Sequence, residues 1–281
     1  MTQYPITHIN GQVSGHISVL DRGFAYGDGF FETCRIYKNK IHLWDLHLNR
    51  LLNTAKCLSM EINPEQLQVW VDNLLQQNPS MDNAILKIQI TRGVGARGYA
   101  FDTNLLPTVV LFLSPANTLL SRQWLDGITV RICDLQLSES SALAGLKHIN
   151  RLENILARAE WKDEFAEGLL FNQKGNVIEG TMSNIFLVKN NQLLTPELSR
   201  SGVAGVMREF IMTKLASAMS LGCQQKNLDM DALLSADEIF MSNSLIGIWP
   251  VTGLHRDRVR NLSVGKITRE LQAALYNHVI A

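Results

Sequence analysis

The sequence predicts an α+β chain with mixed sheets and flanking helices, arranged in two lobes. Three observations support this prediction. Segments of β-rich or alternating hydrophobic character recur in both halves of the chain, and segments with hydrophobic residues at helical spacing lie between them. The stretch 114–126 is the one plausible linker, which places a smaller N-terminal α/β domain at 1–120 and a larger C-terminal domain at 121–281.

The first lobe opens with a predicted hairpin. Residues 29–43 form two β-rich runs joined by a turn at Lys38-Asn39-Lys40. A half-buried strand is predicted at 85–91, because its hydrophobic residues alternate. The other predicted elements of this lobe are a helix with a hydrophobic stripe at Leu48, Leu51, Leu52 and Ala55, a helix from Asn63-Pro64 toward Gln77, a polar glycine-rich loop at 92–102, and a strand at 108–113.

The second lobe also alternates strands with helices. A strand at 128–135 leads through a loop rich in Ser, Ala and Gly to Lys147. The elements expected after it are a helix with a stripe at Leu152, Ile155, Leu156 and Ala159, two strands at 168–180 around a Lys-Gly turn, a strand pair around Asn190-Asn191, a helix from about residue 202 to residue 219, short strands, and a last helix from about residue 263.

Composition and charge exclude several classes of function. The 281 residues are 46% hydrophobic, enough for real cores, and 26 basic residues balance 26 acidic ones. This neutrality argues against nucleic acid or an anionic membrane as the main partner. Because the chain lacks a signal peptide and a membrane-length apolar run, we expect a soluble, cytoplasmic protein. The cysteines lie far apart without a CxxC pair, which indicates thiols in a reducing compartment rather than disulfides or metal ligands: Cys34, Cys57, Cys133 and Cys223.

Lys147 is the first candidate for chemistry. On position alone it is a solvated lysine on a loop. The preceding residues, SALAGL, are mostly small and apolar, a composition that does not favour a charged side chain exposed to solvent. The positive end of the following helix also disfavours the charged ammonium. Both effects favour the neutral amine that attacks an aldehyde such as that of pyridoxal phosphate.

Glu179, at the end of the predicted strand GNVIE, is the second candidate. It is either a strand-end glutamate that faces water or the partner of a pyridine nitrogen. A carboxylate keeps such a nitrogen protonated, so that the ring accepts electrons. Thr181, Ser183 and Asn184 add hydroxyl and amide groups for contacts with a ring or a phosphate.

A bound phosphate needs backbone donors and a cation. Gly202 and Gly205 flank a predicted helix start, where the free amides of Val206 and Met207 point at an anion. Such a glycine-flanked start is common, so the motif is weak by itself. Arg50 is the cation that we select, although helical spacing places it off the hydrophobic stripe and toward solvent.

The loop TRGVGARGY carries two arginines among three glycines. A guanidinium on such a loop is suited to gripping a carboxylate through two parallel hydrogen bonds. Arg92 falls on the apolar face of its strand and is the structural candidate. Arg97 lies in the loop proper and is the better substrate ligand.

Seven motifs, in this order, resemble the class IV aminotransferases, the pyridoxal phosphate fold type IV family. They run from about residue 20 to residue 252: DRGFAYGDGFFET, HLNRL, TRGVGARGY, LAGLKHINRLEN, GNVIEGTMSNIF, GVAGVMR and MSNSLIGIWPV. The resemblance implies a two-lobed fold like that of D-amino acid aminotransferase, with pyridoxal 5′-phosphate bound by the larger lobe. It also implies a homodimer whose active site lies near the interface.

The resemblance assigns roles to individual residues. It implies Lys147 as the Schiff-base lysine, Glu179 at the pyridine nitrogen and Val203 packed on the ring. The phosphate ligands that it implies are Arg50, the amides of Val206 and Met207, and the pair Asn243 and Ser244.

Three activities of this family compete: branched-chain aminotransferase, D-amino acid aminotransferase and 4-amino-4-deoxychorismate lyase. The lyase is favoured by RGVGARGY together with GLKHINRLE and NSLIGIWPV, and branched-chain enzymes lack that loop. D-amino acid enzymes pair the loop arginine with a tyrosine and a histidine, where this chain has Phe31 and Tyr99. Some lyases have Thr-Thr where this chain has Glu32-Thr33, so Thr33 matches the lyases and Glu32 resembles the aminotransferases.

For a lyase, the resemblance implies that 4-amino-4-deoxychorismate yields pyruvate and 4-aminobenzoate, a folate precursor. Lys147 would remove the proton from the amine-bearing carbon, and Lys147 or Thr33 would protonate the leaving group. Arg97, Phe31 and Tyr99 form the expected substrate site. A hypothesis from a different class is a binding protein that keeps the fold without the chemistry.

Overall fold

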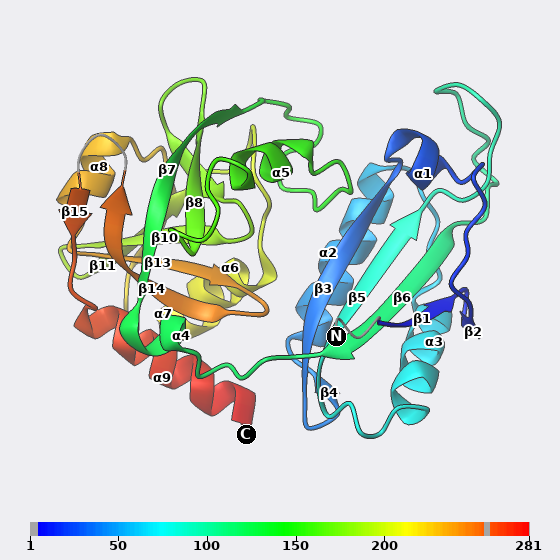
Figure 1. Ribbon diagram of the computed structural model, residues 1–281, viewed down its shortest axis with the longest axis horizontal. Helices are drawn as coiled ribbons and strands as arrows, with labels where there is room; N and C mark the ends of the chain where they lie inside the picture. The colour runs from blue at the N-terminus through cyan, green and yellow to red at the C-terminus, as the bar shows by residue number, and fades with distance from the viewer. Residues whose placement is uncertain (1–4, 256–258, 281) are drawn as a thin grey trace. The chain divides into compact units, whose positions relative to one another are not determined.

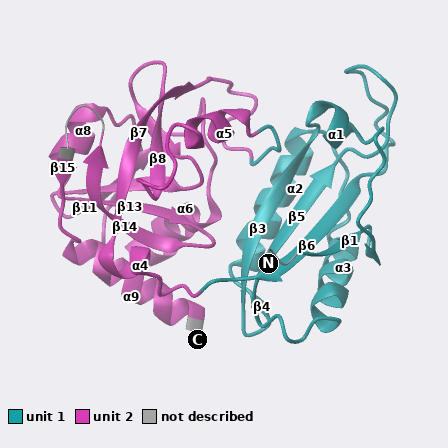
Figure 2. Cartoon of the chain, viewed as in Figure 1, with its two compact units in different colours: residues 1–117, 147–150 teal, residues 118–146, 151–281 magenta. Residues whose placement is uncertain are grey.

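The chain divides into two compact units in a computed structural model that describes residues 5–255 and 259–280. The first unit comprises residues 1–117 and 147–150, and the second comprises residues 118–146 and 151–281 (Figure 2). The predicted boundary, between residues 120 and 121, falls beside the first junction. No sequence pattern predicted that residues 147–150 return to the first unit.

The first unit is an antiparallel sheet covered by helices on one face (Figure 1). The strand order is β2-β1-β6-β5-β3-β4. The strands are β1 (Ile6–Ile9), β2 (Gln12–Val13), β3 (Gly29–Tyr37), β4 (Lys40–Ile41), β5 (Asn83–Thr91) and β6 (Thr108–Pro115). The helices are α1 (Arg22–Tyr26), α2 (Trp44–Cys57) and α3 (Pro64–Gln76).

Local chemistry explains these elements. Lys38 and Asn39 have φ angles of 49° and 60°, the left-handed conformation that a two-residue hairpin turn requires, so the predicted turn is confirmed. The side chain of Asn63 accepts a hydrogen bond from the amide of Gln66, and Pro64 follows it, which fixes the start of α3 as predicted. In β5 the buried residues alternate with half-buried ones. The buried side joins α2 and α3 in the core of this unit.

The second unit contains a mixed sheet, in the order β12-β11-β10-β13-β14-β7-β8-β9, with β15 paired to β14. Its strands are β7 (Ile128–Leu137), β8 (Glu167–Asn172), β9 (Val177–Gly180), β10 (Asn184–Lys189), β11 (Gln192–Pro196), β12 (Cys223–Lys226), β13 (Glu238–Asn243), β14 (Gly247–His255) and β15 (Val259–Asn261). Its helical elements are α4 (Arg122–Asp126), α5 (Leu152–Arg158), α6 (Val206–Phe210), the π-helical turn η1 (Ile211–Leu215), α7 (Ala216–Ala218), α8 (Met230–Ser235) and α9 (Lys266–Ile280). β7 runs parallel to both of its neighbours, β8 and β14, and most other pairs are antiparallel. The predicted α+β class with mixed sheets is therefore confirmed.

Two predictions about helices in this unit need correction. The helix expected from residue 202 begins at Val206, because residues 202–205 form an extended turn in front of it. The hydrophobic stripe expected on α5 does not face a core. Its Leu152, Ile155 and Leu156 are 72%, 61% and 59% exposed, whereas Ala157 is buried.

Among the described residues, we find no helix with the length and hydrophobicity that a membrane span requires.

Candidate active site

Lys147 extends the edge of β3 in the first unit. Its carbonyl accepts a hydrogen bond from the amide of Phe31 at 3.0 Å, and the amide of Ile149 donates to the carbonyl of Gly29 at 3.0 Å. The half-buried Lys147 side chain places its Nζ 4.4 Å from the centre of the Phe31 ring. The structure thus brings two predicted site residues, Lys147 and Phe31, together. The expected effect of the following helix on Lys147 stays a prediction, because α5 belongs to the second unit.

Phe31 and Thr33 lie on the face of β3 opposite the hydrophobic core. Strand residues alternate between faces, and the buried Phe30 and Cys34 belong to the core side. Thr33 is half-buried and pairs in register with Lys87 of β5, whose register partner in β6 is Phe112. This face of the sheet therefore presents an aromatic ring, a hydroxyl and an ammonium beside Lys147.

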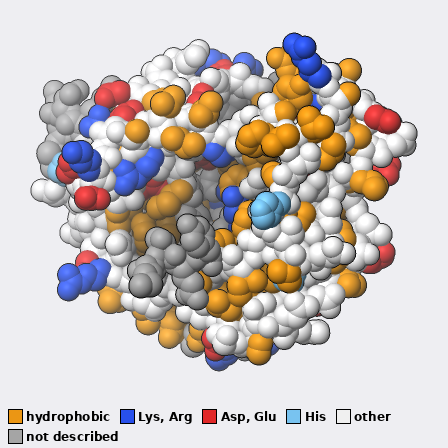
Figure 3. All heavy atoms as spheres, turned by 45° about the vertical axis from the view of Figure 1, so that its right-hand side comes forward, with side chains coloured by type: hydrophobic (Ala, Val, Ile, Leu, Met, Phe, Trp, Pro, Cys, Tyr) orange, Lys and Arg blue, Asp and Glu red, His pale blue; other side chains and the backbone are white. Residues whose placement is uncertain are grey.

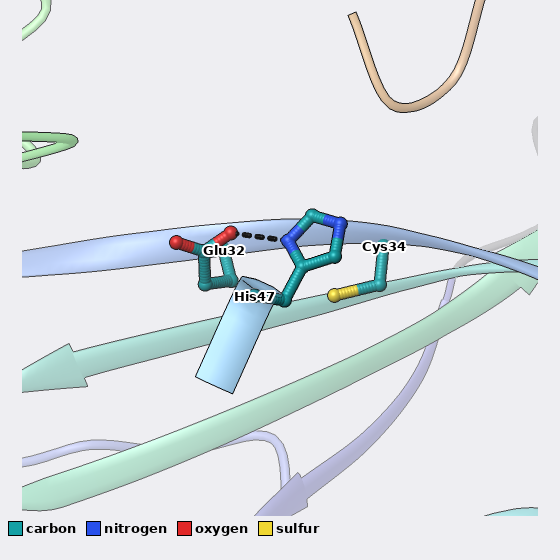
Figure 4. A group of neighbouring side chains, drawn as sticks. All are labelled: Glu32, Cys34 and His47. Carbon is teal, nitrogen blue, oxygen red and sulfur yellow. Dashed lines mark hydrogen bonds and ion pairs between the residues drawn. The ribbon is translucent and has the colours of Figure 1, made fainter. Parts of the chain in front are cut away.

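A buried ion pair joins β3 to α2. The carboxylate of Glu32 accepts hydrogen bonds from Nε and Nη2 of Arg50 at 2.7 and 2.6 Å. It also accepts one from Nδ1 of His47 at 2.6 Å (Figure 4). Burial alone would raise the pKa of Glu32. The charge of Arg50 and the hydrogen bonds from His47 and Arg50 outweigh burial and hold that pKa at about 2. Burial lowers the pKa of His47, against the opposing effect of Glu32, so the imidazole stays neutral and donates through Nδ1.

Helical spacing predicted that the Arg50 side chain faces solvent, and this prediction is wrong. The side chain is only 13% exposed instead of facing solvent. Hydrophobic periodicity detects only apolar residues, and it does not detect that Glu32 on a neighbouring strand provides a buried counter-charge. His47 and Arg50 are three residues apart on α2 and so share a face, a spacing that is visible in the motif HLNR. His47 is a site residue that the sequence analysis missed.

Glu32, Cys34 and His47 also have the residue types of a metal centre, with ligand atoms within 4.8 Å of one another (Figure 4). The electrostatics argue against one. Burial and the charge of Glu32 raise the pKa of the Cys34 thiol well above its usual value, so the thiolate that binds metals is disfavoured. Arg50 already supplies the positive charge beside Glu32. We interpret the group as a support for Arg50.

The glycine-rich loop is built around two buried arginines. Nη1 of Arg22 donates to the carbonyls of Ala96, Gly98 and Ala100 and thus holds the loop from inside. Arg92 donates to both oxygens of Asp28 and to the carbonyls of residues 58 and 59, while its guanidinium lies 3.7 Å from the Phe101 ring centre. Arg92 is structural, as its position on the strand predicted.

Arg97 and Tyr99 are displayed on the outside of this loop. Arg97 is exposed, and the Tyr99 side chain is 88% exposed with an edge contact to Tyr26. Both residues are placed to meet a ligand or another chain. Their role as substrate ligands stays a prediction.

Glu179 lies in β9 of the second unit and is 4% exposed. Its Oε2 accepts a hydrogen bond from the amide of Val203 at 2.8 Å, so it is a buried carboxylate and not a strand end that faces water. Gly145 pairs with the turn before α6, because it donates to the carbonyl of Gly202 and accepts from the amide of Ala204. The structure therefore brings Glu179 and Val203 together, and their roles at a pyridine ring stay predictions.

The start of α6 is closely packed against β10. Nδ2 of Asn184 donates to the carbonyl of Val203 at 2.8 Å. A Cβ on Gly205 would lie 2.0 Å from Oδ1 of Asn184, so only glycine fits there without a shift. Gly205 caps the helix, and helix geometry leaves the amides of Val206 and Met207 without intrahelical acceptors.

Three other predicted site residues, Thr181, Ser183 and Asn243, form hydrogen bonds to nearby groups of the protein. The hydroxyls of Thr181 and Ser183 donate to the buried carboxylate of Glu167, a residue that the sequence analysis missed. Asn243 donates through Nδ2 to the carbonyl of Met182, and its Oδ1 accepts the amides of residues 245 and 246. Asn243 thus shapes the turn that carries the half-buried Ser244. These residues organise the backbone, and their direct contact with a cofactor stays a prediction.

The chemistry of each unit suits a different part of pyridoxal phosphate. The first unit offers an amine beside an aromatic ring and a firmly held guanidinium. The second offers a buried carboxylate next to a glycine turn at a helix start, a cradle that a Cβ would fill. An aldehyde, an acidic ring nitrogen and a phosphate match these donors and acceptors. The residues present therefore fit the cofactor.

Comparisons with known proteins establish the family. Residues 29–254 match the amino-transferase class IV family. Because the match spans most of the chain, this protein is a class IV aminotransferase family member.

The chain is similar to several individual proteins of this family. The chain is 36% identical to an aminodeoxychorismate lyase from Vibrio harveyi over 95% of its own length and 98% of that protein. It resembles the crystal structure of 4-amino-4-deoxychorismate lyase from Pseudomonas aeruginosa with a TM-score of 0.90 and 38% identity, covering 96% of this chain and 98% of that one. A D-alanine aminotransferase from Bacillus licheniformis is 25% identical over 94% of this chain and 92% of that protein.

Proposed function

We propose that this protein is a lyase that converts 4-amino-4-deoxychorismate to 4-aminobenzoate and pyruvate with pyridoxal 5′-phosphate as its cofactor. The observation that carries the proposal is the near full-length similarity to aminodeoxychorismate lyases in sequence and in structure. The site residues support it, because the amine, buried carboxylate and guanidinium that the cofactor needs are all present.

Pyridoxal phosphate, when bound, supplies an electron-accepting ring that is joined to the substrate amine. Lys147 holds the cofactor through Nζ, and Glu179 keeps the ring nitrogen protonated. Arg50, the amides of Val206 and Met207, and the pair Asn243 and Ser244 bind the phosphate. Val203 would contact the ring, and Thr181, Ser183 and Asn184 would supply hydroxyl and amide groups for contacts with the ring or the phosphate.

Two proton transfers complete the proposed reaction. Nζ of Lys147 removes the proton from the amine-bearing ring carbon. The bond between the neighbouring carbon and the enolpyruvyl oxygen then breaks, the ring becomes aromatic, and pyruvate leaves after it gains a proton from Lys147 or from Oγ1 of Thr33. Thr33 lies on the same face of β3 as Phe31, against which Lys147 packs, which supports this second role. No external acceptor is consumed.

The substrate carries two carboxylates, and we assign one of them to Arg97. A guanidinium binds a carboxylate through two parallel hydrogen bonds. Its exposed place on the loop that Arg22 holds leaves the side chain available for a ligand. Phe31 and Tyr99 supply the neighbouring aromatic surface.

The proposal is tested by measuring pyruvate release from 4-amino-4-deoxychorismate, with and without a keto-acid acceptor. We expect the same rate in both conditions, because the lyase reaction needs no acceptor. Conversion of D-alanine with 2-oxoglutarate at a comparable rate would reject the lyase in favour of an aminotransferase. A purified protein that pyridoxal phosphate does not turn yellow would instead favour a binding protein without chemistry.

We propose further that the protein is a cytoplasmic homodimer. Free cysteines suit a reducing compartment. Exposed hydrophobic side chains on α5 support a partner surface on the second unit. Figure 3 shows that hydrophobic side chains gather in places on one face. Sedimentation analysis should give twice the monomer mass, and a Leu156→Glu variant should shift the equilibrium toward monomer. A monomeric wild-type protein at micromolar concentration would contradict this assignment.

A further inference from the structure

Arg208 is a buried arginine close to the start of α6. The residue is 7% exposed. It follows Val206 by two residues, which places it about 3 Å further along the helix axis. The helix continues from α6 through η1 and α7 without a break, over residues 206–218. Arg208 therefore lies beside the backbone amides to which we assign the cofactor phosphate, and the reaction described above gives it no role.

The guanidinium of Arg208 connects α6 to three strands of the second sheet. Its Nε donates a hydrogen bond to Oγ1 of Thr195 in β11 at 3.2 Å. Its Nη2 donates to the carbonyl of Pro196 at 2.8 Å and to Oε1 of Gln225 in β12 at 2.9 Å. The hydroxyl of Thr195 donates in turn to the carbonyl of Ile185 in β10 at 2.9 Å. These bonds hold the start of the helix in place against the sheet.

The acceptors that Arg208 contacts are all neutral groups. In the part of the chain that the structure describes, no carboxylate forms an ion pair with Arg208. Burial lowers the pKa of Arg208, and the neighbouring Cys223, Glu179 and Glu197 offset only part of this effect. Because arginine keeps its proton in proteins, the second unit holds a buried positive charge that no directly bonded anion neutralises.

Anchoring alone does not explain why this residue is charged. A glutamine could donate to the same backbone carbonyl, and a methionine would fill a similar volume. A cation that leaves water without a paired anion has a desolvation cost that neither of these side chains has. A ligand with negative charge nearby would offset this cost, because charges interact over several ångströms in an interior of low dielectric constant.

We propose that Arg208 is a positioning residue of the cofactor phosphate site, whose hydrogen bonds fix the start of α6 and whose buried charge stabilises the phosphate dianion. The phosphate would lie at the amides of Val206 and Met207, so this inference rests on the site proposed above. Nε and Nη2 of Arg208 are both engaged by the strands. We therefore assign Arg208 an effect through the helix start and through its charge, and not a direct contact with the phosphate.

The test compares three substitutions of Arg208. Arg208→Met removes the charge and the hydrogen bonds, Arg208→Gln removes the charge but keeps a donor, and Arg208→Lys keeps the charge. Lys214→Met is the matched control, since Lys214 is an exposed cation of the same helix. The cofactor-free proteins are titrated with pyridoxal phosphate and with pyridoxal, which lacks the phosphate. Phosphorus-31 NMR of the loaded proteins follows protonation of the bound phosphate with pH, and thermal unfolding verifies that each variant is folded.

We expect Arg208→Met and Arg208→Gln to weaken pyridoxal phosphate binding at least about tenfold and pyridoxal binding less than about twofold. In both neutral variants the bound phosphate should take up its second proton at a pH about half a unit or more above that of wild type, because a nearby cation favours the dianion. Arg208→Lys and Lys214→Met should remain within about threefold of wild type in affinity for pyridoxal phosphate.

Three results would overturn the proposal. They are wild-type affinity for pyridoxal phosphate in Arg208→Met or Arg208→Gln, an equal loss for both ligands, and a phosphate titration that coincides with wild type in both neutral variants. If wild type releases no pyruvate from 4-amino-4-deoxychorismate, the lyase assignment fails, whereas the comparison of pyridoxal phosphate with pyridoxal still decides the role of Arg208.

Discussion

The two units place polar groups in different ways. In the first unit the candidate site depends on charged side chains held by other side chains, as when Glu32 fixes Arg50 and Asp28 fixes Arg92. In the second unit it depends on backbone shape: Glu179 binds the amide of Val203, and Asn184 binds the carbonyl of the same residue. Substitutions that remove charge should therefore act most in the first unit, and substitutions that add bulk to the turn should act most in the second.

The largest effect is expected at Lys147. Lys147→Ala removes both the group that holds the cofactor and the proposed base, so pyruvate release should fall by about a thousandfold or more. The absorbance of the bound cofactor should disappear as well. Stopped assays and an absorbance scan measure these outcomes, with Lys40→Ala as the exposed control. A variant that kept its colour would reject the assignment of Lys147.

Glu179 is an exception to this difference between the units, because it is a charged residue of the second unit to which we assign a role in the reaction. Glu179→Gln keeps the shape of the side chain and an acceptor for the amide of Val203, but it removes the charge that maintains a protonated ring nitrogen. We expect kcat to fall about a hundredfold while the protein remains folded. Steady-state kinetics measure this, with Glu209→Gln on the exposed side of α6 as control. Full activity in Glu179→Gln would show that the ring nitrogen needs no carboxylate here.

The ionisation of Glu32 makes the stability of the first unit depend on pH. Its pKa is held at about 2, below the ordinary 4.5, so its ionisation stabilises the fold above pH 4.5 and this contribution is lost as pH falls toward 2. Such a shift corresponds to about 3 kcal/mol. Glu32→Gln should lower the free energy of unfolding by about that amount at pH 7, and the deficit should shrink in acid. Urea denaturation at pH 7 and pH 3 measures both values, and the exposed Glu61→Gln is the control. A deficit that does not change with pH would contradict this explanation.

The smallest effect is expected from added bulk at the α6 turn. Gly205→Ala would bring a Cβ against Oδ1 of Asn184 and shift the amides at the helix start, so the affinity for the cofactor should fall about tenfold. At saturating cofactor, kcat should remain within about threefold of wild type. Titration of the cofactor-free protein measures the affinity. Gly222→Ala, where a Cβ would make ordinary contacts at 3.8 Å, is the control. Unchanged affinity in Gly205→Ala would show that this turn does not bind the cofactor.

Sequence patterns predicted most of the secondary structure, because local signals determine it. The Lys38-Asn39 turn and the start of α3 at Pro64 follow from backbone preferences of single residues. The motifs also drew attention to Lys147 and Glu179, whose roles as cofactor ligands stay predictions. These predictions depend only on residues that are close together in the sequence, so the sequence is enough to make them.

The predictions that failed depend on contacts between distant segments. Arg50 is largely shielded from solvent because Glu32, on the strand β3 that α2 contacts, supplies its counter-charge. The stripe of α5 was detected correctly as apolar, but periodicity does not specify whether such a stripe meets a core or remains exposed.

Reduction of the cofactor-loaded protein with borohydride, followed by peptide mapping, tests the central claim most directly. The treatment fixes the cofactor covalently to the amine that holds it. We predict that the label is found on the peptide containing Lys147 and on no other lysine peptide. A label on another lysine, Lys87 included, would contradict the proposed active site.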